Sequence, residues 1–242
     1  MAHRFRRAAR AAAATLVAAA GSLGTPAAAQ EATGVVGPPP CAYRDVAATI
    51  HPEGDGRWTV LDTVFALPAA WAPEDLVPAR EAGFDDDRTV RAVIVPDLRA
   101  LREAAEVAGV PLALRSAFRS YAYQATTFAY WVQRDGEAAA LATSARAGHS
   151  EHQLGTAVDL GSAGGPAPWD VADWADTPAG AWLQRNGWRF GFVASYPEGA
   201  ADLSCYAYEP WHWRWIGREL AAVVHARSAV PRDVLWEVTH AP

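Results

Sequence analysis

The spacing of apolar and polar residues predicts a mixture of short strands and helices. A β-favouring run covers residues 57–65 and ends at Leu67-Pro68. From Pro96 onward, apolar residues recur at helical spacing as far as residue 108, and Gly109 is suited to a C-terminal cap. Residues 111–118 are then expected to form a buried strand.

The same mixture continues in the second half of the chain. Ser120 is suited to cap a helix that continues past Trp131. Further strands are expected over residues 156–160 and 188–193, and further helices over residues 177–187 and 216–227. Because strands and helices do not alternate in regular strand–helix–strand units, the pattern predicts an α+β fold in a single domain.

Residues 1–29 are typical of a secretory signal peptide rather than of a folded segment. They begin with several arginines, continue with an apolar run over residues 11–20, and end in the small residues Ala27–Ala29 that a signal peptidase reads. The apolar run is short for a membrane span. We therefore expect cleavage after Ala29 and export, with a retained leader acting as a membrane anchor as the alternative.

Composition sets the class of the remaining chain. Residues 30–41 are a linker rich in glycine and proline, which cannot build a core. Residues 42–242 are long enough to form one domain that buries most of its apolar surface. Of the 242 residues, 51% are hydrophobic and 20% are charged, which excludes a disordered chain and a multi-span membrane protein.

The basic residues of the chain are all arginines. The absence of lysine excludes Schiff-base catalysis, phosphate binding by a P-loop lysine and acyl-enzyme centres of the S-x-x-K type. The net charge is −6, and it becomes −10 when the leader, with four arginines and no acidic residue, is removed. An acidic domain is poorly suited to neutralise phosphates, so no nucleic-acid partner is expected.

The chain has two cysteines, Cys41 and Cys205. In an oxidising compartment an even pair predicts a disulfide, and two buried free thiols are the alternative. A bridge between residues so far apart would stabilise the fold by roughly 5 kcal/mol in the chain-entropy model.

The main candidates for chemistry are His152, Asp159, Glu209 and His212. Catalytic zinc takes three protein ligands from histidines and carboxylates and keeps a fourth position open. His152 and Asp159 are seven residues apart, and Gly155 between them permits a turn that brings the two side chains together. His212 comes from a distant segment, as a third ligand often does.

Glu209 is the candidate general base. Pro210 favours an extended Glu209, so this is not the helical H-E-x-x-H motif, which the chain lacks. An extended turn can still place the carboxylate near the metal, where it would act first as base and then as acid. The alternative is a surface carboxylate beside an aromatic strand. Glu151 and His149 compete for these roles, and we interpret His149 as a pocket-wall or solvent-facing histidine.

Positive charge near the site must come from arginine. Arg115 and Arg119 flank the end of a predicted strand, and a guanidinium can bind a carboxylate or stabilise an oxyanion. Arg119 is preferred because it adjoins the polar helix start at Ser120. A surface ion pair with one of the many acidic residues is the expected fate of the other arginine.

Three segments in fixed order carry a resemblance to a known family: RSAFRS at residues 115–120, GHSEHQLGTAVD at residues 148–159 and EPWHWR at residues 209–214. Over residues 42–220 the chain resembles the VanY-type zinc D-alanyl-D-alanine carboxypeptidases. The resemblance implies a small antiparallel sheet flanked by helices, of the Hedgehog/D-Ala-D-Ala-peptidase type. It also implies an amino-terminal segment at residues 42–95 and a catalytic core at residues 96–220.

The resemblance also implies a role for each motif residue. His152, Asp159 and His212 would bind one Zn²⁺ ion, Glu209 would be the catalytic base, and Arg119 would steady the scissile carbonyl. Four further positions would contact substrate: Ser120, Gln124, Ser150 and Trp211. The chain departs from the family where Trp213 replaces the more usual tyrosine, and the tail beyond residue 227 matches no part of it.

The implied activity is hydrolysis of the terminal D-Ala-D-Ala bond of peptidoglycan stem peptides, with release of D-alanine. We expect a secreted, cell-wall-associated monomer without a protein partner. Two alternatives remain open: an endopeptidase or dipeptidase that cleaves another bond of the wall, and a non-catalytic wall-binding domain. Glu209 argues against the second, because binding alone has no use for a base beside the metal.

Overall fold

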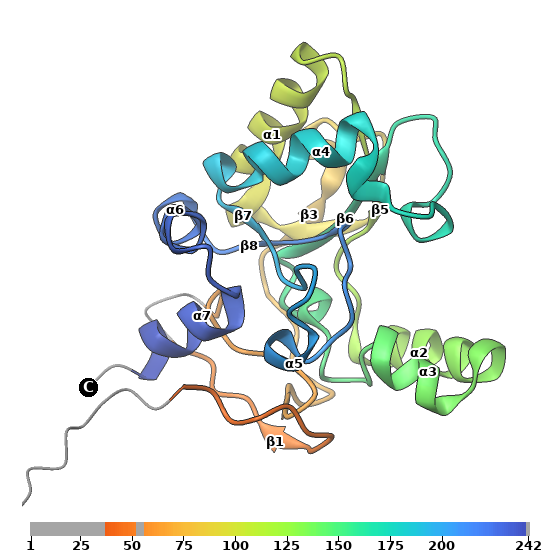
Figure 1. Cartoon of the computed structure of the whole chain (residues 1–242), viewed down its shortest axis with the longest axis vertical. Coiled ribbons are helices and arrows are strands. Elements are labelled where there is room, and N and C mark those ends of the chain that lie inside the picture. Colours follow the sequence, from red (N-terminus) through yellow and green to blue (C-terminus); the bar gives the residue numbers. More distant parts are fainter. Residues whose placement is uncertain (1–36, 52–55, 241–242) are drawn as a thin grey trace, which may run out of the picture. The chain divides into compact units, whose positions relative to one another are not determined.

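The computed structural model describes residues 37–51 and 56–240 (Figure 1). The predicted leader and residues 30–36 of the predicted linker lie outside the described residues. The helices are α1 (Val95–Val107), α2 (Tyr121–Asp135), α3 (Glu137–Thr143), α4 (Pro178–Asn186), α5 (Ala201–Ser204), α6 (Arg218–Arg227) and α7 (Pro231–His240). None of the helices in these ranges is long and apolar enough to cross a membrane.

An antiparallel sheet of the order β5-β6-β8-β7 forms the centre of the fold. Its strands are β5 (Leu112–Ser116), β6 (Ala157–Ser162), β8 (His212–Trp215) and β7 (Phe192–Ala194). The register places Asp159 of β6 opposite both Ser116 of β5 and His212 of β8. The α+β prediction and the small antiparallel sheet are confirmed.

Helices α1 and α4 lie next to each other over one side of this sheet (Figure 1). Leu98 and Leu101 of α1 and Leu183 of α4 are fully buried, and they belong to the same core cluster as Leu160 of β6 and Phe192 of β7. α1 begins and ends within a residue of its predicted bounds, because Pro96 fits the first turn and Gly109 adopts a positive φ just beyond the helix.

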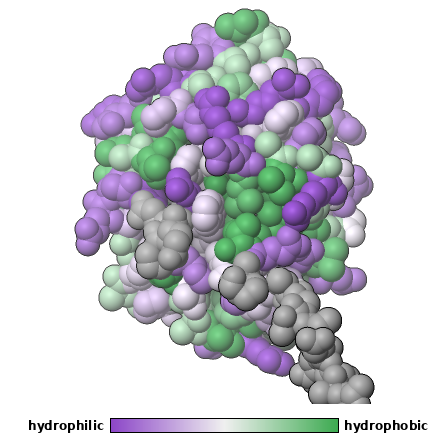
Figure 2. All heavy atoms as spheres, turned by 90° about the vertical axis from the view of Figure 1, so that its left-hand side faces the viewer, coloured by the Kyte–Doolittle hydropathy of each residue, from purple (hydrophilic) through white to green (hydrophobic). Residues whose placement is uncertain are grey.

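A second core cluster lies under α6 and α7, with Val193 of β7 and Ile216 as members. α7 was not predicted. On the side where α6 and α7 lie, the surface carries an apolar area among hydrophilic side chains (Figure 2). Val223 of α6 and Val238 of α7 are among the exposed apolar side chains.

Two predicted strands are shorter than expected. In the run 57–65, only β2 (Phe65–Ala66) pairs, in parallel with β1 (Val46–Ala47). The Asp62 carboxylate accepts hydrogen bonds from the backbone N–H groups of Val64 and Phe65, which replaces ladder pairing at this point.

The prediction for residues 188–193 is likewise wrong in its first half. Gly191 has a φ of 85°, and this left-handed residue ends a 3-10 turn at Gly187–Phe190 before β7 begins. The remaining sheet pairs β3 (Leu76–Pro78) with β4 (Thr89–Arg91).

The predicted disulfide is confirmed, since Cys41 is bonded to Cys205 at the end of α5. It fixes the first described segment to the chain that leads into Glu209. A buried ion pair acts in the same region, because Arg232 of α7 donates from Nε to Asp62 at 2.6 Å and also donates to the Pro39 carbonyl. The disulfide and this ion pair therefore link the first described residues to α5 and α7.

Candidate metal centre

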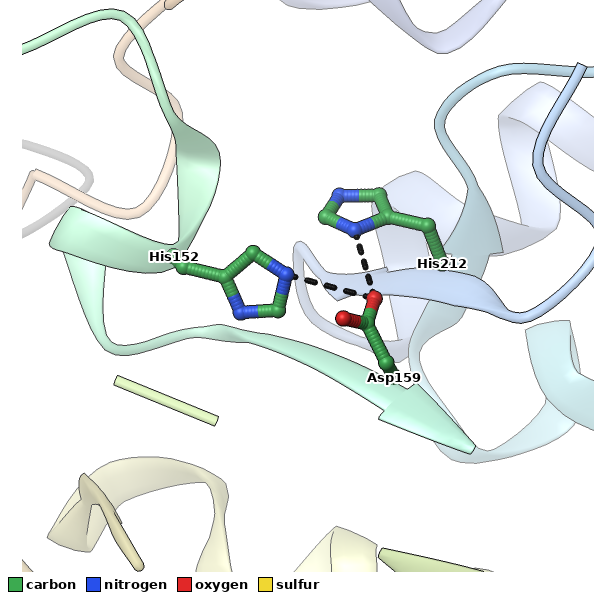
Figure 3. Close-up of side chains that lie close together, drawn as sticks. All are labelled: His152, Asp159 and His212. Carbon is green, nitrogen blue, oxygen red and sulfur yellow. Dashed lines mark hydrogen bonds and ion pairs between the residues drawn. The ribbon is translucent and has the colours of Figure 1, made fainter. Parts of the chain in front are cut away.

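His152, Asp159 and His212 meet in a buried cluster (Figure 3). Nε2 of His152 lies 3.2 Å from Oδ1 of Asp159, and Nδ1 of His212 lies 3.0 Å from the same oxygen. The three ligand atoms all lie within 4.8 Å of one another. Among the residues that the structure describes, this is the only group of three or more His, Cys, Asp or Glu side chains that could hold a metal ion.

The sheet register brings two of these residues together. Asp159 and His212 are direct partners on neighbouring antiparallel strands, so their side chains leave the sheet on the same face. His152 comes from the 3-10 turn Glu151–Leu154, where Ser150 Oγ accepts from the His152 backbone N–H. Gly155 ends the turn at a φ of 70°, and a Cβ there would lie 2.9 Å from Cγ of Arg91, so this position requires glycine.

The second nitrogen of each imidazole is also bonded. Nδ1 of His152 lies 2.7 Å from the Ala117 carbonyl oxygen, which can only accept, so Nδ1 carries the proton. Nε2 of His212 lies 2.9 Å from Oε2 of Glu151. The nitrogens left facing Asp159 are therefore Nε2 of His152 and Nδ1 of His212, as Figure 3 shows.

Charges around the cluster favour an ionised Asp159 and a neutral His152. Burial, helped by the nearby Arg119 guanidinium, lowers the pKa of His152 to about 4. Burial alone would raise the pKa of Asp159, yet His152 and His212 together hold it well below its usual range. Burial would lower the pKa of His212, but its hydrogen bonds to Asp159 and Glu151 raise it to about 10. The site is thus built around anionic carboxylates.

A cavity of about 580 Å³ opens beside the cluster. Its lining includes all three clustered residues as well as Glu209, Arg119 and Trp211. Helices α2 and α3 supply one wall through Tyr123, Trp131 and neighbouring side chains. A larger hollow lies between residues 37–40 and α7, and the described residues that line it include no histidine, so the chemistry is assigned to the cavity beside the cluster.

Glu209 lies at this cavity, three residues before His212. Its carbonyl accepts from the His212 backbone N–H at 3.1 Å, and its own N–H donates to the Tyr196 carbonyl at 3.2 Å. Burial, reinforced by Asp159 and Glu151, raises the pKa of Glu209 to about 7 despite the opposing charges of His212 and Arg119. A carboxyl group with this pKa can both take and return a proton near neutral pH.

The two candidate arginines have different environments. Arg119 lines the cavity with Nη2 at 3.8 Å from Oδ2 of Asp159, and its buried Nε has no hydrogen-bond partner among the described residues. Arg115 also lines the cavity, but its Nη2 donates to the carbonyl oxygens of Ser162 and Gly165. The expectation of a surface ion pair for the second arginine is therefore wrong, because Arg115 fixes a loop.

The other predicted substrate residues divide into two pairs. Ser150 and Trp211 line the cavity. Ser120 and Gln124 do not: Ser120 Oγ caps α2 by accepting from the Tyr123 N–H, and buried Gln124 donates from Nε2 to the Ala145 carbonyl at 2.6 Å. Both side chains hold α2 in place instead of facing a ligand in the cavity.

His149 is neither a wall of the cavity nor solvent-facing. It is 1% exposed, and its ring lies between the Asp62 carbonyl at Nδ1 and the Asp45 carboxylate at Nε2. The interpretation as a pocket or solvent histidine is wrong, since both ring nitrogens bind protein oxygens.

Glu151 has a role that was not predicted from the sequence. Its carboxylate is buried and contacts His212, Ser195 and Arg214. Burial would raise the pKa of Glu151, but Arg214 and the hydrogen bond from His212 lower it to about 2. Glu151 is not among the residues that line the cavity, so it is not the general base. The signal was present in the sequence, because His212 and Arg214 are two residues apart on one strand and share a face.

Comparison with known proteins identifies the family of the chain. Residues 87–218 match the family model described as VanY: D-alanyl-D-alanine carboxypeptidase. The chain is 36% identical over 164 residues to YodJ of Bacillus subtilis (strain 168), whose name assigns a carboxypeptidase only provisionally. That alignment covers 66% of this chain and 60% of YodJ, so the chain spans less than two thirds of this relative.

Solved structures of similar fold include two peptidases. The LdcB LD-carboxypeptidase is 29% identical, with a TM-score of 0.65, over 78% of this chain and 93% of its own. The vancomycin resistance D,D-pentapeptidase VanY, solved as a variant in complex with Zn(II), is 26% identical, with a TM-score of 0.64, over 74% of this chain and 98% of its own.

Proposed function

Because the chain belongs to the VanY family of D-alanyl-D-alanine carboxypeptidases, we propose that it removes D-alanine from peptidoglycan stem peptides by zinc-dependent hydrolysis of the terminal D-Ala-D-Ala bond. The observation that carries the proposal is the convergence of His152, Asp159 and His212 beside Glu209 in one cavity.

The donor set of this cluster fits zinc. Two imidazole nitrogens and one carboxylate oxygen are a common ligand set of catalytic zinc, and here they lie close enough to share one ion. The related VanY structure contains Zn(II). A zinc ion bound by these side chains would act as a Lewis acid on the scissile carbonyl and ease the deprotonation of water.

The remaining steps fall to side chains of the chain itself. Glu209, with its pKa near neutrality, takes the proton of the attacking water and returns it to the nitrogen of the departing D-alanine. The Arg119 guanidinium, whose Nε has no partner among the described residues, donates hydrogen bonds to the oxygen that becomes negative during attack. Ser150 and Trp211 contact the peptide from the cavity lining.

The cavity also supports a peptide substrate. Its volume of about 580 Å³ falls in the range of pockets that bind drug-sized ligands, so it can hold more of a stem peptide than its two C-terminal residues. Its walls combine aromatic side chains of α2 with Arg119. The upstream residues of a stem peptide would lie along these walls, while its C-terminal residues lie at the metal centre.

A second candidate activity is the removal of D-alanine from an L,D bond. The similarity to the LdcB LD-carboxypeptidase favours it, because the same scaffold carries that specificity. Dipeptidase or endopeptidase activity, and a binding module without catalysis, are weaker candidates. The raised pKa and the position of Glu209 at the cavity favour hydrolysis over mere binding.

We also propose that the protein acts outside the cytoplasm at the cell wall, as a monomer. The leader-like residues 1–29 and the Cys41–Cys205 disulfide support export into an oxidising compartment.

The test is product analysis on defined substrates. Zinc-loaded protein is incubated with a stem pentapeptide ending in D-Ala-D-Ala and, separately, with the tetrapeptide ending in an L,D bond. Release of D-alanine from the pentapeptide, abolished by a chelator and restored by zinc, is the expected result. Release from the tetrapeptide alone would favour the second candidate, and release from neither would overturn hydrolysis of a terminal D-alanine.

A further inference from the structure

Both ring nitrogens of His212 face a carboxylate. Nδ1 lies 3.0 Å from Oδ1 of Asp159, and Nε2 lies 2.9 Å from Oε2 of Glu151. Asp159 lines the cavity with the other predicted ligands, whereas Glu151 does not. The two contacts are therefore not equivalent: the first faces the metal centre, and the second lies behind the ring.

Glu151 is held in place by two further partners. Oε1 accepts from Nη1 of Arg214 at 2.7 Å, and Oε2 accepts from the Ser195 hydroxyl. Arg214 is fully buried, and its Nη2 donates to the backbone carbonyls of Arg57 and Thr59. A carboxylate with these contacts has little freedom to rotate, and its charge is balanced within the protein.

His152 provides an internal comparison. Its second nitrogen, Nδ1, donates to the Ala117 carbonyl, a neutral acceptor, at 2.7 Å. The corresponding acceptor for His212 is an ionised carboxylate. Partners of this kind fix the tautomer of a metal-binding histidine and increase its basicity as a ligand.

We infer that Glu151 is a positioning residue that holds the proton of His212 on Nε2, so that Nδ1 is presented to the metal while His152 presents Nε2. Glu151 touches neither substrate nor metal and acts through the ring of His212. The inference rests on the proposed zinc site and extends it to a residue outside the ligand set.

The direct test is the tautomer of each histidine in the zinc-loaded wild-type protein, measured by long-range ¹H–¹⁵N NMR of the imidazole rings. We expect a protonated Nε2 on His212 and a protonated Nδ1 on His152. This measurement needs no variant and therefore does not depend on whether a variant folds.

The variant test measures zinc affinity by competition with a chelating dye and records the visible spectrum of the cobalt-substituted protein. Glu151→Gln should weaken zinc binding by about 10- to 100-fold and change the cobalt spectrum. The control is Asp62→Asn, which alters another buried carboxylate–arginine pair, Asp62–Arg232; the Asp62 carboxylate bonds to Val64, Phe65 and Arg232 and not to a proposed zinc ligand. It should lower the melting temperature without changing zinc affinity or the cobalt spectrum.

The outcomes separate this inference from the proposed function. Wild-type protein that binds zinc with the proton of His212 on Nδ1 would overturn the positioning role and leave the proposed hydrolysis standing. A folded Glu151→Gln variant with wild-type zinc affinity and cobalt spectrum would do the same. Wild-type protein that binds no zinc would overturn both.

Discussion

Asp159 and His212 are direct partners on the antiparallel strands β6 and β8, and Oδ1 of the one lies 3.0 Å from Nδ1 of the other. A metal site built on paired strands has two of its ligands fixed by sheet hydrogen bonds. The third, His152, depends on a single turn that ends at Gly155. Precision at the centre therefore comes mainly from the register of the sheet.

Replacing Asp159 removes the only carboxylate among the proposed ligands. Losing a residue that only supports a ligand weakens metal binding by up to about 100-fold. Asp159 is itself a proposed ligand, so we expect Asp159→Ala to weaken zinc binding by more than this. The protein should stay folded, because the backbone pairs of β6 remain. Chelator competition measures the affinity, and circular dichroism checks the fold. An unchanged zinc affinity would remove Asp159 from the ligand set.

Glu209→Gln should separate metal binding from turnover. The amide keeps the shape of the side chain but cannot accept the proton of water, so kcat should fall by about 10²- to 10⁴-fold while zinc content stays stoichiometric. D-alanine release and metal analysis on one preparation measure both. Turnover within a few-fold of wild type would show that another group is the base.

Arg119→Ala should lower turnover by orders of magnitude, since the loss of one contact to a developing oxyanion costs about 3–4 kcal/mol. Zinc should remain bound. Arg115→Ala is the matched control at the same cavity: the Arg115 guanidinium donates to the carbonyls of Ser162 and Gly165, so its loss should appear mainly as a lower melting temperature. If Arg119→Ala retains near-normal turnover, the assigned role is wrong.

The disulfide should contribute to stability more than to chemistry. The double variant Cys41→Ser/Cys205→Ser should lower the free energy of unfolding by about 2–5 kcal/mol. Zinc affinity should change little, because the proposed ligands lie on the sheet and on the turn at residues 151–154. Urea unfolding of the metal-free protein measures the loss, and equal unfolding midpoints for both proteins would contradict it.

Asp45 should give the fold a defined acid dependence. A hydrogen bond from His149, with help from Arg146, lowers the pKa of Asp45 in the folded protein. The stabilisation is present above the unfolded-state pKa of about 4 and is lost as the pH falls through the lower folded-state value.

The matching experiment compares wild type with Asp45→Asn, both without metal, by calorimetry between neutral and acid pH. The wild type should melt at the higher temperature at neutral pH, and the difference should shrink below about pH 4. A difference that stays constant across this range would show that Asp45 is not responsible.

The sequence was informative where local signals and tertiary structure agree. The helical spacing from Pro96 predicted α1, and the motifs around His152 and His212 predicted residues that the fold brings together. The prediction from sequence was wrong where a side chain accepts backbone hydrogen bonds that a strand would need, or where a glycine adopts a left-handed conformation. The Asp62 carboxylate accepts backbone hydrogen bonds that a strand at residues 57–65 would have used. Gly191 has a positive φ, so β7 begins only after it.

The misplaced polar residues have a common cause. His149 and Gln124 each donate to a backbone carbonyl on another segment, namely that of Asp62 and that of Ala145. Nothing in the local pattern identifies such acceptors. Glu151 differs, because its position next to His152 and the spacing of His212 and Arg214 on one strand are visible in the sequence once the sheet is known.

Anomalous diffraction at the zinc edge, from crystals grown with zinc, tests the central claim most directly. We expect one zinc peak, with Nε2 of His152, a carboxylate oxygen of Asp159 and Nδ1 of His212 at distances of about 2.0–2.2 Å and the Glu209 carboxylate next to the open side of the ion. A zinc-loaded crystal with no peak among these three side chains, or with its peak on other ligands, would contradict it.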